Sequence, residues 1–166
     1  MDIYDALLFL HLVGSTAMFA GWAIEFRMLA GRDGPSRADR AALLGPIGMM
    51  AAFLSGLTMM IWRWGPQPWM PVAIGGVVLL TAVGIGALIT VRKGRVDAAR
   101  RRRIEIASLG ARVGIGLALL AIMAAKPGTA ASVALLAFGL LAGLLPATVR
   151  PNAGSAAARR PASEAH

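Results

Sequence analysis

The first apolar segment of the chain carries side chains that can bind a metal ion or carry a proton. They recur at spacings of four, three, four and three residues, and they are His11, Ser15, Met18, Trp22 and Glu25. These spacings place them on one stripe of a helix. Imidazole is a common ligand of haem iron and other metals, and it also transfers protons near neutral pH. The stripe therefore predicts a ligand site or a proton carrier at His11, and the alternative is a neutral ring that hydrogen-bonds a neighbouring helix.

A haem iron needs one or two axial ligands from the protein. No second histidine lies in an apolar segment, so the expected partner is the thioether of Met59 at similar depth, or His11 of a second subunit. The other methionines of the apolar segments are interpreted as packing, because Met fills irregular gaps. The cofactor prediction is haem, a porphyrin or copper, with His11 and Met59 as the binding residues and His11 as the metal ligand.

A second pair of polar residues is expected near the opposite membrane surface. Arg112 lies inside the fourth apolar segment, where a guanidinium must meet a carboxylate or extend to the lipid headgroups. Glu25 lies at a compatible depth. The sequence predicts an ion pair that forms a gate or binds an anionic headgroup. The alternative is that each side chain reaches the headgroups separately.

The chain lacks the motifs of several enzyme classes. It has no cysteine, no glycine-rich phosphate loop, no H-E-x-x-H motif and no serine nucleophile with a base at a suitable spacing. Hydrolysis and phosphoryl transfer are therefore not expected. Whether the protein is an enzyme stays open, and an enzyme built from these residues would be a membrane oxidoreductase.

The elements that must position these residues are membrane spans. Hydrophobic residues make up 57% of the 166 residues and the mean hydropathy is +0.67, which is too apolar for a soluble fold. About 20 apolar residues cross a bilayer core of about 30 Å, and five segments qualify: 6–24, 42–62, 70–91, 106–125 and 130–149. The prediction is an all-α transmembrane helix bundle over residues 1–150. A re-entrant hairpin is the alternative for the fifth segment, because only a Lys-Pro-Gly-Thr turn precedes it.

Basic residues indicate the orientation of the bundle, because they are retained in the cytoplasm. Most follow the first segment, follow the third segment or lie in the C-terminal tail, whereas the other two loops hold only Arg63 and Lys126. We therefore expect five spans in a bacterial inner membrane, with the N-terminus outside and residues 151–166 disordered in the cytoplasm. Nucleic acid is not an expected partner. Anionic lipid headgroups are the expected partners of a cluster that consists of Arg100, Arg101, Arg102 and Arg103.

Small residues at four-residue spacing predict where the helices touch. They recur on three segments, at Gly48, Ala52 and Gly56, at Gly110 and Gly114, and at Gly139 and Gly143. Gly14 and Gly21 border the His11 stripe, so the ring is expected to face the second and third segments. Space for a ligand beside the ring is expected at Gly56 and at Gly75-Gly76.

Short motifs in the first half of the chain resemble a group of small bacterial membrane proteins. The run His11-Leu12-Val13-Gly14, followed by Gly21 and Arg27, is similar to the first helix of copper-resistance D-like and HemJ-like proteins, a group that includes uncharacterised families. The second segment of this chain and the loop after it also resemble the second helix and outer loop of that group, through Ser55-Gly56-Leu57, Trp62, Trp64-Gly65 and Trp69. The resemblance implies that His11 ligates haem, as in members linked to protoporphyrinogen oxidation, or lies near copper. Met18 departs from the pattern, because an aromatic residue is usual there.

Two further functions stay open from the residues alone. The stripe from His11 to Glu25 would suit a small transporter or a proton pathway, although the third and fifth segments add few polar side chains. A small chain with a basic cytoplasmic face would also suit a non-catalytic subunit of a larger membrane complex, or a homo-oligomer.

Reporter fusions test the orientation. Fusions after Arg40, Arg103 and Arg160 are expected to report a cytoplasmic location, and fusions within 63–68 and 126–129 an external one, because each loop follows the same charge rule. A cytoplasmic signal from 126–129 would contradict a fifth complete span.

Overall fold

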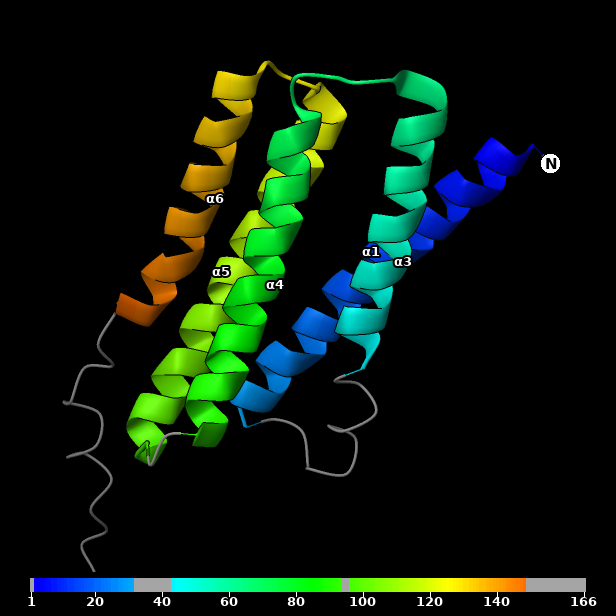
Figure 1. Cartoon of the computed structure of the whole chain (residues 1–166). Helices are drawn as coiled ribbons and strands as arrows, with labels where there is room; N and C mark the ends of the chain where they lie inside the picture. Colours follow the sequence, from blue (N-terminus) through cyan, green and yellow to red (C-terminus); the bar gives the residue numbers. More distant parts are fainter. Residues whose placement is uncertain (1, 32–42, 94–95, 149–166) are drawn as a thin grey trace, which may run out of the picture.

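Five helices that alternate in direction form the described part of the chain (Figure 1). The computed structural model describes residues 2–31, 43–93 and 96–148. The helices are α1 (Ile3–Leu29), α3 (Leu44–Met59), α4 (Met70–Lys93), α5 (Ala98–Ala125) and α6 (Thr129–Thr148). Each helix is long and apolar enough to cross a membrane. For α3 this span includes the turn that follows the helix. The predicted all-α transmembrane bundle is confirmed.

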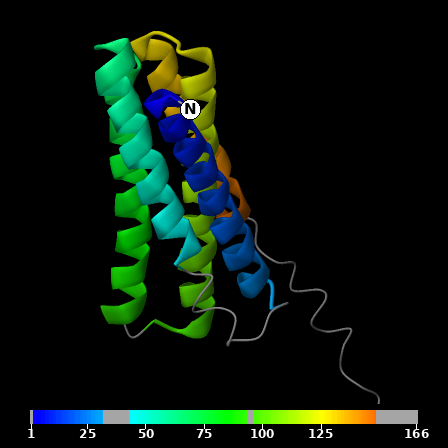
Figure 2. The ribbon, with the colours of Figure 1, turned by 90° about the vertical axis from the view of Figure 1, so that its right-hand side faces the viewer.

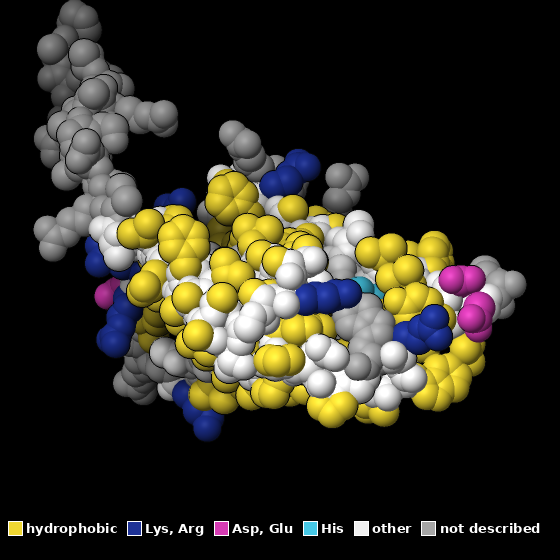
Figure 3. All heavy atoms as spheres, turned by 90° about the horizontal axis from the view of Figure 1, so that it is seen from above, with side chains coloured by type: hydrophobic (Ala, Val, Ile, Leu, Met, Phe, Trp, Pro, Cys, Tyr) yellow, Lys and Arg dark blue, Asp and Glu magenta, His cyan; other side chains and the backbone are white. Residues whose placement is uncertain are grey.

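The two ends of the bundle differ in charge. The start of α1 lies at the same end as the α3–α4 and α5–α6 connections, here called the N-terminal end (Figure 1). Seen from there, acidic side chains gather at the start of α1 and hydrophobic side chains surround the bundle (Figure 3). The opposite end, here called the basic end, carries Arg92 and Lys93 of α4 and Arg100 to Arg103 of α5. The predicted disordered tail, 151–166, lies outside the described residues.

The start of α5 differs from the hydropathy-based prediction. The Asp97 carboxylate accepts a hydrogen bond from the backbone N–H of Arg100 at 2.7 Å, which caps the helix before its apolar part begins. One turn later Arg101 pairs with Glu105 at 2.9 Å. The basic cluster up to Arg103 therefore lies in the first turns of a helix and not in a loop that ends at residue 106.

The fifth span is a complete helix. α6 continues without a break from Thr129 to Thr148 and has the length and hydropathy of a membrane span. A re-entrant hairpin would instead turn back within the segment. Lys126 ends α5 in the left-handed conformation, with φ of 47°, and so reverses the chain. The Thr129 hydroxyl donates to the carbonyl of Pro68 at 2.9 Å, which ties together the two connections at the N-terminal end.

Glycines bring the helices together in two close pairs. In the α1–α3 pair, a Cβ atom at Gly14 would lie 2.6 Å from the backbone N of Ala52, and one at Gly48 would lie 2.5 Å from the backbone N of Met18. In the α5–α6 pair, a Cβ atom at Gly114 would overlap the carbonyl of Gly139. Both pairs use the small residues that the spacing predicted, and only glycine allows the backbones this close.

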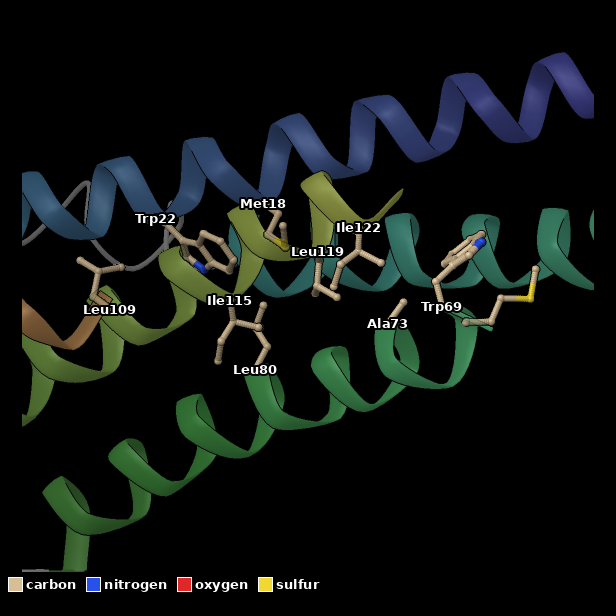
Figure 4. Packing of buried hydrophobic residues seen from close by; sticks show 10 residues of the cluster. Met18, Trp22, Trp69, Ala73, Leu80, Leu109, Ile115, Leu119 and Ile122 are labelled. Carbon is tan, nitrogen blue, oxygen red and sulfur yellow. The ribbon is translucent and has the colours of Figure 1, made fainter. Parts of the chain in front are cut away.

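The two pairs meet mainly at α5. This helix packs against α6, α4 and α1, whereas α3 and α4 form no extended contact within the described chain. Figure 1 shows α1 crossing behind α3, Figure 2 shows the two helices side by side, and Figure 4 shows Ile115 of α5 opposite Leu80 of α4. The Trp22 ring lies where a Cβ atom of Gly116 would come within 2.7 Å of it, so this aromatic ring joins α1 to α5. The lack of close packing between α3 and α4 leaves room for a cavity.

Substitution of Gly114 tests the α5–α6 packing. Gly114→Leu is expected to lower the free energy of unfolding by at least about 1–3 kcal/mol, because the added atoms meet backbone that cannot move aside. Gly86→Leu is the matched control, since nothing lies within 4 Å of a Cβ atom at Gly86. Thermal unfolding in detergent checks the pair, and equal melting temperatures for the two variants would contradict the packing.

Candidate functional site at His11

The His11 ring points from α1 into the bundle. Its Nδ1 lies 2.7 Å from the carbonyl oxygen of Ala52 on α3. A Cβ atom at Gly56 would lie 3.0 Å from both Cε1 and Nδ1 of the ring, so this glycine makes the room that the imidazole occupies. The inward orientation that the stripe predicted is confirmed, and so is the role of Gly56.

The hydrogen bond to Ala52 determines the form of the imidazole. A carbonyl oxygen only accepts, so Nδ1 carries the proton and donates it to Ala52. In the neutral ring, Nε2 then holds a free lone pair. No other described residue hydrogen-bonds to the ring. Metal-binding histidines have the same arrangement, in which one ring nitrogen donates to a carbonyl and the other faces the metal.

A small apolar cavity lies beside the ring, between α1, α3, α4 and α5. The space that the centre of a water molecule can occupy is about 70 Å³, and the empty space including the open side is about 670 Å³. Apart from His11, the only polar side chain in the lining is Ser15. The lining also contains thioethers from three helices and the turn after α3: Met18, Met49, Met60 and Met123. The cavity therefore offers one imidazole nitrogen and several sulfur atoms, without a carboxylate.

The helix register separates these methionines by depth. Gly56 lies beside His11 and Gly48 beside Met18, so Met18 and Met49 lie about 10 Å deeper than His11, at 1.5 Å per residue. The Thr81 hydroxyl of α4 lies 3.9 Å from the sulfur of Met49, but it donates its proton to the carbonyl of Val77 at 2.9 Å. Met60 lies about one turn from Gly56 towards the N-terminal end. Met123 lies seven residues beyond Gly116, also towards that end, and lines the same cavity as His11.

Met59 and the Gly75-Gly76 pair, which the sequence placed beside the His11 ring, lie outside the lining of the cavity. Met59 is not among the residues that line the cavity, and its neighbour Met60 is. Ala52, Gly56 and Met60 are four residues apart and therefore share one face of the helix. The prediction of Met59 considered only its depth in the membrane, whereas this spacing points to Met60.

The Gly75-Gly76 pair does not open the cavity, contrary to the prediction. Gly75 has nothing within 4 Å of a Cβ position, and Gly76 packs against Leu119 and Leu136. The cavity instead lies beside Ala73 and Val77 of α4, which belong to its lining. Its space comes from the separation of α3 and α4, which the sequence does not reveal.

Glu25 and Arg112 form an ion pair between α1 and α5. Nη2 of Arg112 lies 2.5 Å from Oε1 of Glu25, with side-chain exposures of 17% and 37%. Nε of Arg112 also donates to the carbonyl of Ser108 at 3.3 Å, and Gly84 of α4 leaves room for its aliphatic stem. The expected pairing is present, and neither residue lines the cavity. The pair is therefore a separate link between helices, on the basic side of Trp22.

No family model, curated protein or solved structure matches this chain. Across the described residues, no three His, Cys, Asp or Glu side chains are grouped so that they could hold a metal ion. A metal at His11 would therefore depend on sulfur ligands from methionine. The resemblance to copper-resistance D-like and HemJ-like proteins stays a prediction.

A double-mutant cycle tests the ion pair. Glu25→Gln and Arg112→Met are expected to show a coupling of about 1 kcal/mol in unfolding free energy, because the pair is partly shielded from solvent. Arg101 and Glu105 are the control pair, with side-chain exposures of 60% and 29%, and an exposed pair couples by about 0.3–0.5 kcal/mol. A smaller coupling for Glu25 and Arg112 than for the control would contradict this role.

Proposed function

We propose that this protein binds copper(I) at His11 within a bacterial inner membrane, with its N-terminus outside. The observation that carries the proposal is the hydrogen bond from Nδ1 to the Ala52 carbonyl. It leaves the lone pair of Nε2 free in a ring that lines an apolar, methionine-rich cavity. Imidazole nitrogen and thioether sulfur form a ligand set that suits copper(I).

The lining residues favour a soft monovalent ion over harder ones. Magnesium, calcium and manganese prefer carboxylate, carbonyl and water oxygens, and no Asp or Glu lines the cavity. A charge of one is also less costly than a charge of two in an apolar site. Met60 and Met123 are the proposed sulfur ligands, because Met18 and Met49 lie about 10 Å deeper than His11 at 1.5 Å per residue.

A haem or a porphyrin fits this cavity less well. An engineered cavity of about 150 Å³ accepts benzene, and the space here is about 70 Å³. A tetrapyrrole therefore enters only if the helices separate. Haem also carries carboxylates, and no Arg or Lys lines the cavity to pair with them. The chemistry of the lining thus supports copper among the cofactors that the sequence predicted.

The chain's own residues would hold the ion and keep water away from it. The Ala52 carbonyl fixes the orientation of the His11 ring, and the close α1–α3 contact fixes Ala52. Trp22 is 4% exposed and packs on Gly116, which separates the cavity from Glu25. A continuous proton pathway along the stripe is therefore less favoured than a closed binding site, and the proposal assigns no reaction.

Copper(I) titration of the detergent-purified protein tests the proposal. With bicinchoninate as the competing chelator and ascorbate as the reductant, one ion per chain is expected to bind. His11→Ala is expected to weaken binding by at least about tenfold, because it removes the nitrogen ligand. Met60→Leu and Met123→Leu are expected to weaken it, while Met50→Leu is the control, since Met50 is 51% exposed and outside the cavity.

X-ray absorption separates ligation from indirect effects. One nitrogen and one or two sulfur neighbours are expected around copper in the native protein, and the nitrogen is expected to disappear in His11→Ala. Equal copper affinity of the native protein and the folded His11→Ala variant would contradict the proposal. A Soret band in the native protein that is absent in His11→Ala would show that His11 binds haem, and it would contradict the copper proposal.

A further inference from the structure

The cavity at His11 opens sideways into an apolar groove between α3 and α4. Phe53 and Leu57 of α3 line one wall, and Ile74 and Val77 of α4 line the other. The two helices form no extended contact that would close the groove, and its empty space including the open side is about 670 Å³. Ile74 of the α4 wall is 36% exposed, so the groove reaches the apolar outer surface of the bundle.

Hydrocarbon fills such a groove better than water does. Its walls offer almost no hydrogen-bonding groups, so water inside would lose hydrogen bonds without replacement. The wall on α3 runs from Met49 to Met60, which is about 16 Å at 1.5 Å per residue. That is about half of a bilayer core of about 30 Å, so the groove matches one acyl chain of one leaflet.

An arginine follows the wall of the groove at its N-terminal end, three residues after Met60. After Met60 the chain continues as one π-helical turn, η1 (Met60–Trp64), a conformation that is frequent at functional sites. Arg63 lies on this turn, is exposed, and has no hydrogen bond or ion pair with another described residue. Its neighbour Trp62 is 65% exposed. An arginine beside a tryptophan at the end of a span is suited to a phosphate in the headgroup layer.

We propose that the groove between α3 and α4 binds one anionic phospholipid, with an acyl chain along Phe53 and Val77 and its phosphate on Arg63. The chain of the lipid forms the missing wall of the cavity and excludes other molecules from its open side. Anionic lipid is favoured because the headgroup of a zwitterionic lipid carries its own cation beside the phosphate. This lipid site does not depend on the proposal that His11 binds copper.

Native mass spectrometry of the full-length protein tests this site. The protein is extracted in a mild detergent with equal amounts of phosphatidylglycerol and phosphatidylethanolamine. One retained phosphatidylglycerol per chain is expected. Val77→Trp, which fills the groove, is expected to lose it, and Arg63→Ala is expected to reduce retention of phosphatidylglycerol several-fold relative to phosphatidylethanolamine.

Matched variants separate the groove from ordinary lipid contact. Val78→Trp is the control for Val77→Trp, because Val78 is 62% exposed and lies outside the groove. Arg92→Ala is the control for Arg63→Ala, as an exposed basic residue at the opposite end of the bundle. Both controls are expected to keep the lipid. Equal lipid retention by Val77→Trp and Val78→Trp would overturn the proposal, and so would a dimer that only Val77→Trp dissociates, since a second copy would then occupy the groove.

Discussion

The close approach of α1 to α3 is the constraint on which the proposed site depends. Gly14 and Gly48 lack the side chains that would hold the two backbones apart. Because the backbones touch, the Ala52 carbonyl of α3 reaches Nδ1 of His11 at 2.7 Å. That single hydrogen bond orients the ring, determines which nitrogen carries the proton and leaves Nε2 free. In lipid, where a buried polar group has few partners, such a bond is also a stabilising link between the helices.

The cavity exists because the bundle consists of two closely packed parts, α1 with α3 and α5 with α6 and α4, that meet at only a few places. α1 and α5 are joined by Trp22 on Gly116 and by the ion pair of Glu25 with Arg112. Both links lie on the basic side of the cavity, and α3 and α4 do not pack closely along their length, although Thr81 of α4 lies 3.9 Å from the sulfur of Met49 on α3. The space near His11 therefore stays open on one side. The proposed copper site and the proposed lipid site are two consequences of this uneven packing.

The sequence predicted the features that follow from helix periodicity and from the cost of polar groups in lipid. The inward ring of His11, the ion pair of Glu25 with Arg112 and the glycine contacts all have short, local signals in the sequence. Features that depend on how helices pair were missed. Gly76 packs on α5 and α6 instead of opening the cavity, and Met60 lines the space where depth alone suggested Met59. α5 begins before the apolar segment that hydropathy identifies, because the Asp97 side chain caps the helix at its N-terminus.

The most direct test of the account is the protonation state of the two nitrogens of His11. The chain has two histidines, His11 and His166, so a His166→Gln variant purified without a polyhistidine tag and labelled with ¹⁵N reports on His11 alone. Solid-state NMR in lipid bilayers is expected to show a protonated Nδ1 and an unprotonated Nε2, and copper(I) is expected to shift the Nε2 resonance. A protonated Nε2 with a bare Nδ1, or two resonances that copper(I) leaves unchanged, would contradict the account.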